Sequence, residues 1–401
     1  MNAEQKRQND IAVAQKILAQ TFGVDVQLEP GKDEGLSGRT YVHRLRVSAT
    51  SATVPNSVIM KQAVIREEGQ VYDPTSTEPH SPAALLFNDW AGVQFLTEVC
   101  TEPLPAPRFY GGSHEHGFFL MEDLGAGERL DMALLGTDAA RAEQTLLALF
   151  QTLGRMNAQT IGREVRYNEI RSSLGPQPTL TDSPDKNEEI IAKLRGAMTL
   201  IDVTATEEFY EDLATLLSMV NDAGPFSAYI HSDACPDNCH WVTDENGEDE
   251  LRLLDLEDGH FSHALIDGTY AHIPFPSCWC NNRLPKSLIQ KAEDVYRAEL
   301  SKGCPQAQND EDFYRAVIAV SAYRIFNPFA FLLSEVLEED YAWGISTPRQ
   351  RAFMFFDHLA EMCETHGYYP SVGTTARTIL KKLHTLWPDT EEMPYYPAFR
   401  A

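Results

Sequence analysis

The sequence has few basic residues for its length. Its 401 residues include 33 lysines and arginines against 59 aspartates and glutamates, so the formal net charge is −26. Such a field repels phosphate backbones and anionic lipid headgroups, which disfavours nucleic acid or a membrane surface as a partner. It attracts cationic or metal-complexed ligands, although solubility alone is a sufficient reason for a charged surface.

The sequence also has few cysteines, and it lacks both the pattern of a leader and long apolar runs. The seven cysteines are odd in number and scattered, which does not suit a disulfide framework. The N-terminal stretch MNAEQKRQNDIAVAQKIL lacks the basic start and apolar core of a signal peptide. No run reaches the roughly 18 apolar residues that span a bilayer. These absences predict reduced thiols in a cytoplasmic protein, and they leave its oligomeric state open.

The chain is rich enough in apolar residues to bury a large core. Hydrophobic residues make up 43% and aromatic residues 10% of the sequence, and no proline-, serine- or glutamine-rich tract interrupts them. The N-terminal third predicts a helix over 3–22, strands within 35–47 and 57–65, a helix over 81–99, and strands at RFYGG and GFFLMEDL. Beyond about Thr137, helical patterns dominate, with a short β insert near 227–256 and late helices over 283–302, 308–336, 347–366 and 371–387.

This order of elements predicts an α+β fold with two lobes. Residues 1–123 would form a small lobe with an antiparallel sheet and one helix, and residues 124–401 a larger, mainly helical lobe. The join is expected at EDLGAG, from Glu122 to Gly127, because turn residues follow a buried strand there. A cleft between two lobes is a usual place for a ligand.

Residues 228–258 carry most of the chemistry. The dipeptide Asn246-Gly247 is typical of a two-residue hairpin turn between the apolar runs CHWV and LRLLDL. A hairpin closed at this turn would place Asn238 opposite Asp255, with Cβ atoms about 5 Å apart. Asp233 precedes Asn238 on the same connecting loop and could reach the same space.

An amide oxygen and a carboxylate at one place suit a hard cation such as Mg²⁺, which leaves other coordination positions to water and phosphate oxygens. A second carboxylate nearby could accept a proton from a hydroxyl nucleophile. In protein kinases a base Asp is followed, after four residues, by an Asn and later by a metal-binding Asp. The segment HSDACPDN followed by Asp255 has this order and the first spacing.

HSDACPDN followed by LLDLEDG resembles the signature of the aminoglycoside phosphotransferase family, which shares the protein-kinase-like fold with choline and fructosamine kinases. The resemblance covers roughly residues 30–275. It implies that Asp233 is the catalytic base, that Asn238 and Asp255 hold Mg²⁺, and that the cleft binds ATP. The protein would then be a kinase that phosphorylates a hydroxyl of a small molecule.

The same resemblance implies the remaining nucleotide contacts. In VIMKQ it makes Lys61 the strand lysine that holds the α- and β-phosphates, and in FNDWAGVQFL it makes Asp89 its acidic partner, where the family has glutamate. It places the glycine-containing turn EGLSGRTY, with Ser37 and Gly38, and the hinge in FLMEDLG, with Glu122 and Leu124, beside the nucleotide.

Two positions depart from the family pattern, and neither is a presumed catalytic group. LGRMNA has Asn157 where the family often shows histidine, and HSD, with Ser232, replaces the commoner HGD. His231 is expected to brace the loop, and Asp267 resembles a family position with a structural role.

The substrate side is expected after Asp255. Glu257 and Asp258 could meet a cationic substrate such as an aminoglycoside, a choline-like amine or an amino sugar, although a solvated acidic loop fits equally well. Cys278-Trp279-Cys280, together with Cys235, Cys239 and His240, has the residue types of a zinc site but not the CxxC spacing of common zinc knuckles. We therefore expect a structured loop in which Trp279 helps to shape a substrate pocket.

Two alternatives remain open. A nucleotide-binding pseudokinase could regulate a partner without transferring phosphate. A zinc metallopeptidase could use HSD as an HxD ligand motif, although such a motif is expected early in its domain and with further ligands downstream.

Overall fold

The computed structural model describes residues 3–31, 41–65, 71–177, 185–243, 247 and 249–400. The chain forms two compact units. Unit 1 contains residues 1–128, 163–180 and 240–260, and unit 2 contains residues 129–162, 181–239 and 261–401. The α+β class predicted from the sequence is confirmed, because a sheet dominates one unit and helices dominate the other.

Unit 1 is built on a five-stranded antiparallel sheet in the order β1-β2-β3-β5-β4. Its strands are β1 (Val26–Pro30), β2 (Val42–Ala49), β3 (Ser57–Gln62), β4 (Phe109–Ser113) and β5 (Phe118–Glu122). The alternation of side chains along β3 sends Val58 and Met60 to one face and Ile59 and Lys61 to the other. This alternation decides which helix Lys61 meets.

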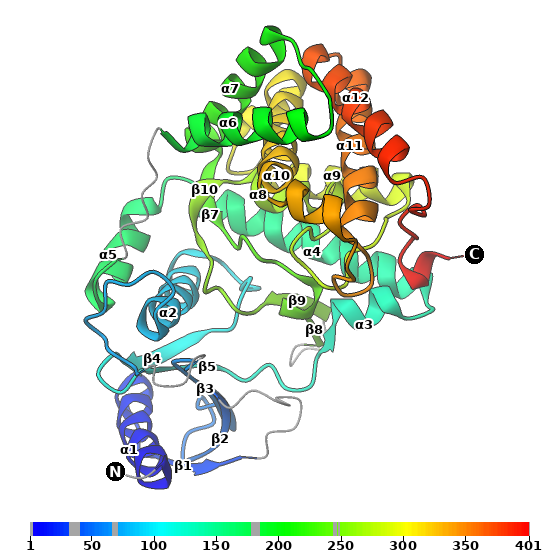
Figure 1. Ribbon diagram of the computed structural model, residues 1–401. Coiled ribbons are helices and arrows are strands. Elements are labelled where there is room, and N and C mark those ends of the chain that lie inside the picture. Colours follow the sequence, from blue (N-terminus) through cyan, green and yellow to red (C-terminus); the bar gives the residue numbers. More distant parts are fainter. Residues whose placement is uncertain are drawn as a thin grey trace. The chain divides into compact units, whose positions relative to one another are not determined.

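Helix α1 (Ala3–Phe22) covers the face that carries Val58 and Met60, and its bounds agree with the predicted helix (Figure 1). Ala14 and Leu18 of α1 are fully buried against apolar side chains of β1, β2, β3 and β5. Gly23 ends the helix with a φ of 67°, a left-handed conformation that glycine adopts without steric cost.

Helix α2 (Pro82–Val99) lies on the side of β4 and β5, and its bounds also agree with the prediction. It begins at Ser81, whose hydroxyl accepts the N–H of Ala84, and Pro82 occupies the first turn. Trp90 of α2 lies 5.7 Å from the Phe109 ring and 6.1 Å from the Phe119 ring. The residue facing this indole is Gly112, where a Cβ would stand only 2.4 Å from the ring.

Two later segments return to unit 1, so its boundary differs from a single join near residue 123. Helix α5 (Glu164–Leu174) packs against α2, and β8 (Cys239–Thr243) and β9 (Asp249–Leu253) form a second sheet in the order β6-β8-β9 with β6 (Glu128–Arg129). Leu253 N–H donates to the carbonyl of Pro105 at 2.8 Å. The Arg171 guanidinium donates to Asn88, and the Asn88 amide donates to the Glu257 carbonyl, which ties these segments to α2.

Unit 2 is mainly helical. Its helices are α3 (Leu130–Leu135), α4 (Ala139–Thr160), α6 (Asp185–Leu200), α7 (Glu207–Asn221), α8 (Leu265–Gly268), α9 (Lys286–Leu300), α10 (Asp310–Glu338), α11 (Pro348–His366) and α12 (Pro370–Leu386). Strands β7 (Ser227–Ile230) and β10 (His260–His263) form a two-stranded sheet. The four late helices match their predicted ranges to within three residues, because their apolar periodicity is regular and prolines mark three of their starts.

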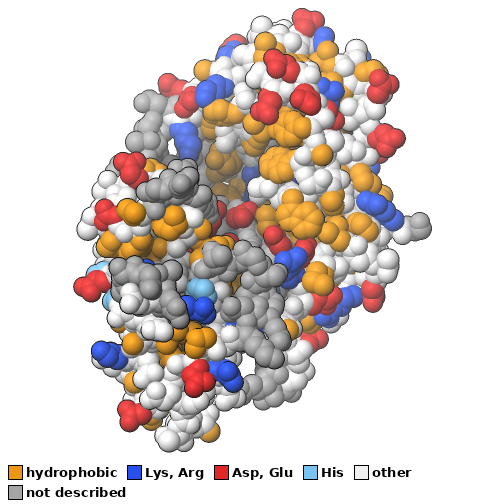
Figure 2. Space-filling model, turned by 60° about the horizontal axis from the view of Figure 1, so that its bottom comes forward, with side chains coloured by type: hydrophobic (Ala, Val, Ile, Leu, Met, Phe, Trp, Pro, Cys, Tyr) orange, Lys and Arg blue, Asp and Glu red, His pale blue; other side chains and the backbone are white. Residues whose placement is uncertain are grey.

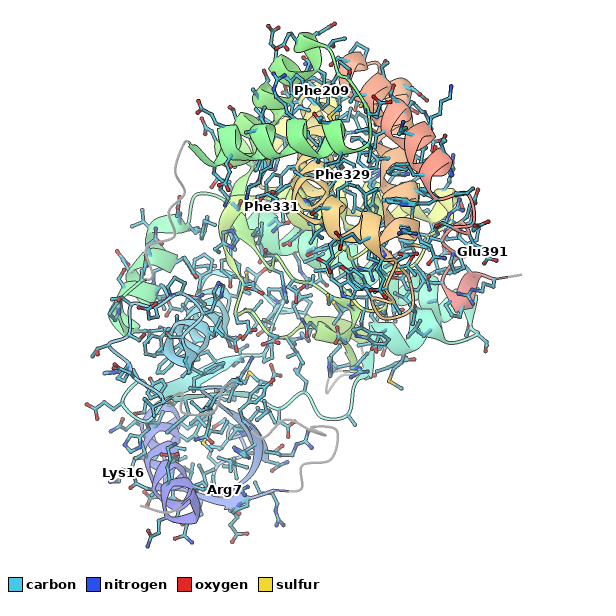
Figure 3. All side chains as sticks on the ribbon, in the orientation of Figure 1. Arg7, Lys16, Phe209, Phe329, Phe331 and Glu391 are labelled. Atoms are coloured by element: carbon cyan, nitrogen blue, oxygen red, sulfur yellow. The ribbon has the colours of Figure 1, made fainter. Side chains whose placement is uncertain are left out.

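Helix α10 is the centre of unit 2 and packs against α6, α7 and α11. Phe326 of α10 lies 5.5 Å from Phe209 of α7 and 5.7 Å from Phe356 of α11, while Phe329 lies 4.8 Å from Phe356. Figure 3 labels Phe209 and Phe329 within this core and Phe331 on the same helix. Phe331 is exposed, with the Lys193 ammonium 3.7 Å from its ring centre.

One helix within the described ranges, α10, is long and apolar enough to cross a membrane by length and composition, although no run of 18 apolar residues occurs in the sequence. Most of its apolar window is buried inside the unit. A core helix surrounded by other helices has this composition without a bilayer. Acidic and basic side chains are dispersed over the visible surface in Figure 2, and the acidic excess does not collect in a single patch there.

Candidate active site

A buried lysine lies between two carboxylates in unit 1. The Lys61 ammonium is 2.5 Å from Oδ2 of Asp89 and 2.6 Å from Oδ1 of Asp255. Strand β3 presents Lys61 on the face toward α2, α2 supplies Asp89, and the segment after β9 supplies Asp255. Lys61 and Asp89 are buried, whereas Asp255 is partly exposed. Two carboxylates that are distant from Lys61 in the sequence therefore both contact its ammonium.

The electrostatics of this cluster keep the lysine charged. Burial alone would lower the pKa of Lys61, but the charges and hydrogen bonds of Asp89 and Asp255 raise it above its usual value. Burial raises the pKa of the Asp89 carboxyl, and the nearby negative charge of Asp255 raises it further. The positive charge of Lys61 lowers this pKa but does not cancel the rise. An ammonium has three N–H donors, so after these two contacts a third remains for a phosphate oxygen.

The shorter side chain of Asp89 does reach its lysine. Its second oxygen, Oδ1, accepts the backbone N–H of Leu256 at 2.8 Å, so the carboxylate spans α2 and the segment after β9. Asp255 adopts a φ of 66°, in the left-handed region that aspartate tolerates better than most residues. This turn directs the Asp255 carboxylate to Lys61 and the next N–H to Asp89.

The segment after β5 is held by a contact that was not predicted from the sequence. Arg44 of β2 donates two hydrogen bonds to Asp123, at 2.6 and 2.9 Å. Burial would raise the pKa of Asp123, but the hydrogen bonds from Arg44 and its neighbours lower it below its usual value. The signal was weak in the sequence, because arginine on a strand and aspartate in a turn are both common without a partner.

The predicted nucleotide contacts fall at different places around this hinge. Glu122 ends β5, and its N–H and carboxylate are engaged with the backbone of Arg108. The Leu124 backbone has no hydrogen bond among the residues that the structure describes, and its contact with an adenine stays a prediction. Ser37 and Gly38 lie outside the described residues.

Glu257 and Asp258, predicted on the substrate side, follow the lysine cluster in unit 1. Asp258 is exposed, and its carbonyl accepts a hydrogen bond from His260. The Glu257 carbonyl accepts the amide of Asn88, so its backbone is fixed beside α2. Whether these side chains contact a substrate stays a prediction.

Unit 2 contains the loop with the predicted base. Asp233 is partly buried, and its Oδ1 accepts hydrogen bonds from the Ser277 hydroxyl at 3.1 Å and the Cys235 thiol at 3.3 Å. The amide nitrogen of Asn238 donates to the Asp233 carbonyl at 3.2 Å. This bond ties the Asn238 side chain to the backbone of the Asp233 loop. Because Asn238 and Asp255 belong to different units, their shared Mg²⁺ stays a prediction.

The loop owes its shape to Asp267, which the resemblance assigned a structural role. The buried Asp267 carboxylate accepts the backbone N–H groups of His231 at 2.8 Å and Ser232 at 3.1 Å. Burial raises the pKa of Asp267, while these bonds and His231 oppose the rise. Tyr270 donates to the carbonyl of Ser232 at 2.6 Å, so both sides of that residue are held.

These bonds explain both departures from the family pattern. Ser232 has a φ of 68°, a left-handed conformation that favours glycine, and the bonds from Asp267 and Tyr270 hold a serine there. Asn157 is fully buried; it donates to the Tyr229 carbonyl and accepts from the Tyr296 hydroxyl, each at 2.8 Å. It links α4, β7 and α9 and so has a structural role.

Trp279 lies in a loop of unit 2, as expected for the segment PFPSCWCNNRLP. Its side chain is 39% exposed and hydrogen-bonds to Asp237, and its carbonyl accepts the N–H of Ile345. The exposed ring fits a role in binding an apolar or cationic group, which stays a prediction.

The HxD alternative finds no support in this geometry. His231 is fully buried beside Asp267, and Asp233 is bonded to Ser277 and Cys235. Within the described ranges, the one group of histidine, cysteine and acidic side chains spaced to hold a metal includes neither His231 nor Asp233. A dinuclear peptidase site would need both.

No family model and no curated protein matches the sequence. Solved structures similar to the chain include choline kinase from Cryptosporidium parvum Iowa II, with 10% identity, coverage of 90% of this chain and 97% of that chain, and a TM-score of 0.42. Ethanolamine kinase from Plasmodium vivax has 9% identity, coverage of 87% and 83%, and a TM-score of 0.42. Spectinomycin phosphotransferase in complex with ADP and spectinomycin has 12% identity, coverage of 92% and 98%, and a TM-score of 0.38. At such values these similarities transfer no residue roles to this chain.

Proposed function

We propose that this protein is an ATP- and Mg²⁺-dependent kinase that transfers a γ-phosphate to a hydroxyl of a small molecule. The observation that supports this most is the buried Lys61 ammonium between Asp89 and Asp255. A lysine on the third strand, paired with an acid on the helix that follows, is the arrangement that positions ATP phosphates in kinases. Apolar packing alone does not explain why such a charge cluster is buried.

Each part of the nucleotide and the metal is assigned to residues whose chemistry suits it. Lys61 would hold the α- and β-phosphates with its remaining donor, and the Leu124 backbone would meet the adenine. Asn238 and Asp255 would hold Mg²⁺, which offsets the charge that develops on the transferring phosphoryl group. Carboxylate and amide oxygens are ligands that Mg²⁺ prefers, and both side chains have an oxygen suited to it.

Asp233 would accept the proton of the attacking hydroxyl. Its carboxylate is partly exposed, and the Ser277 hydroxyl and the Cys235 thiol orient one of its oxygens. A base of this kind contributes roughly 10²- to 10⁴-fold to a rate. The Asp267 carboxylate would act on Asp233 only through the loop backbone, as a positioning residue.

The acceptor would be a hydroxylated amine. The net charge of −26 attracts cations, and Glu257, Asp258 and the exposed Trp279 ring are the side chains we assign to it. We expect Glu257→Gln and Asp258→Asn to raise the KM for a cationic acceptor more than for a neutral one, measured with the same nucleotide concentration.

Nucleotide binding is tested by thermal unfolding with and without Mg²⁺-ADP. Ligand at about 100 times its Kd should stabilise the fold by roughly 2.7 kcal/mol, which raises the Tm by several degrees. The magnesium-dependent part of the shift should shrink in Asp255→Asn but not in Asp25→Asn, an exposed aspartate of the same unit. The absence of a shift with any purine nucleotide would refute the proposal.

Phosphate transfer is tested by coupled ADP release with aminoglycosides, choline-like amines and amino sugars as acceptors. Asp233→Asn should abolish release and leave Mg²⁺-ADP binding unchanged, whereas Asp222→Asn, at an exposed helix end of the same unit, should change neither. Binding without release for every acceptor would favour the pseudokinase alternative.

A further inference from the structure

Four of the seven cysteines converge on one place in unit 2, and one of them, Cys235, also donates to Asp233. Cys235 and Cys239 flank the short helix at Pro236–Asn238, and Cys278 and Cys280 lie on the Trp279 loop. All four are buried and form no disulfide, and Cys278 Sγ is 3.2 Å from Cys280 Sγ. The other three lie apart, at Cys100, Cys304 and Cys363.

Two of these thiols and one carboxylate have the spacing of metal ligands. Cys235 Sγ, Cys278 Sγ and an oxygen of Asp237 all lie within 4.8 Å of one another. Two thiolates on one tetrahedral Zn²⁺, each about 2.3 Å from it, are about 3.8 Å apart. A displacement of about 1 Å or less per side chain therefore closes the three ligands around one ion.

The surroundings hold this arrangement in place. Arg351 of α11 is buried and donates to the carbonyls of Pro276 at 2.9 Å and Cys278 at 3.0 Å. Asn281 donates to the carbonyl of Phe275 at 3.2 Å, and the Trp279 side chain hydrogen-bonds to Asp237. Ligands that are oriented by such outer contacts bind metals more tightly than free side chains.

The charge of Arg351 supplies an independent argument. Its guanidinium donates to carbonyls and to the Ser346 hydroxyl, and in the described part of the chain none of its hydrogen-bond acceptors is charged. A buried cation normally has an anionic partner. Two thiolates and a carboxylate around a divalent ion leave one net negative charge, next to the carbonyl that Arg351 already binds.

We propose that Cys235, Cys278 and Asp237 bind one Zn²⁺ ion. Binding releases a proton from each thiol that becomes a ligand. Thiolates favour zinc over Mg²⁺, so this site is distinct from the one proposed for catalysis. The ion joins the loop of Asp233 and Asn238 to the Trp279 loop. The sequence argued against zinc because CxC is not a knuckle spacing, but the ligands come from two loops.

The decisive measurement uses the full-length wild-type protein, purified under reducing conditions. We expect about one equivalent of zinc per chain by elemental analysis. After removal by a chelator, Co²⁺ should restore one equivalent and produce thiolate-to-cobalt charge-transfer absorption with tetrahedral visible bands. The chelated protein should have a Tm several degrees lower, which added zinc restores.

The matched variants are Cys278→Ser and Cys235→Ser at the site and Cys363→Ser, a buried cysteine of α11, as control. The site variants should lose the zinc and the cobalt spectrum, whereas the control should keep both. The wild-type cobalt titration does not depend on any variant folding. No bound metal and no thiolate-to-cobalt band would overturn the proposal. A Cys278–Cys280 or Cys235–Cys278 disulfide in the protein as isolated from cells would overturn it as well.

Discussion

The two units position their functional groups by different means. In unit 1, a charge cluster positions Lys61. Its ammonium is buried and is fixed by two carboxylates at 2.5 and 2.6 Å. In unit 2, Asp267 fixes the loop backbone through two N–H groups, and the contacts of Asp233 itself are with an uncharged hydroxyl and thiol. In the proposed reaction, the group assigned to phosphate is thus fixed by charge, whereas the group assigned as base is fixed through the backbone that carries it.

The largest effect is expected from breaking the charge cluster. Lys61→Met leaves two carboxylates without their cation, and breaking a buried pair costs about 3–5 kcal/mol. Denaturant unfolding should show this loss, which should be smaller at pH 5 than at pH 8. Burial raises the pKa of Asp89, so without Lys61 the folded protein takes up a proton as pH falls and recovers stability.

The control for this variant is Lys16→Met, which removes an exposed lysine of α1 that Figure 3 labels. Its change in unfolding free energy should stay within about 0.5 kcal/mol. If Lys61→Met were equally mild at pH 8, the cluster would not be the stabilising feature that the distances indicate.

Removing the backbone support of unit 2 should cost less and act on a different step. Asp267→Asn leaves one carbonyl oxygen for two backbone N–H groups, so we expect a loss of about 2 kcal/mol. The catalytic rate should fall while the Kd for Mg²⁺-ADP stays unchanged, because the lysine cluster is intact. Equal losses of nucleotide affinity and rate would contradict this division of roles.

A buried histidine should make unit 2 sensitive to acid. Burial lowers the pKa of His263 to about 3, whereas the unfolded chain has a histidine pKa near 6.5. Below pH 6.5 the unfolded state binds the extra proton, so the folded state loses up to about 1.4 kcal/mol per pH unit. His263→Asn keeps an acceptor for the Leu265 N–H and should flatten this slope.

The matched control lies on the same strand. His260→Asn changes an exposed histidine of β10 and should leave the slope of stability against pH as in the wild type. Chemical unfolding at half-unit steps between pH 5 and 7 compares the three proteins. Parallel curves for all three would show that His263 contributes no acid sensitivity.

The smallest effect is expected at Ser232. Its φ of 68° costs a serine about 1 kcal/mol, and Ser232→Gly removes that cost while it adds freedom to the unfolded chain. The net change should be a stabilisation of about 0.5 kcal/mol or less, seen as a small rise in Tm. A clear loss of stability would mean that the serine side chain makes a contact worth more than the strain.

Much of this protein could be predicted from its sequence. The helices over 3–22 and 81–99 and the four late helices of unit 2 were predicted from apolar periodicity, which reports the buried face of each element, whereas β1 was not predicted. The Lys61–Asp89 contact was implied by the family resemblance, and the structure shows that the shorter acid does reach the lysine. Periodicity did not reveal that residues 163–180 and 240–260 return to unit 1, because it describes each element alone.

Only the tertiary structure decided the contacts between distant residues. Lys61 and Asp255 are 194 residues apart, Asp89 and Leu256 are 167 apart, and Arg44 and Asp123 are 79 apart. The meeting of Cys235 with Cys278 is of the same kind. Residue types determine which positions are charged. Local patterns predict which positions are buried or in turns, since burial and turns depend on near neighbours. Which of them share one site depends on chain topology, because hydrogen bonds and ion pairs act over a few ångströms, whatever the sequence separation.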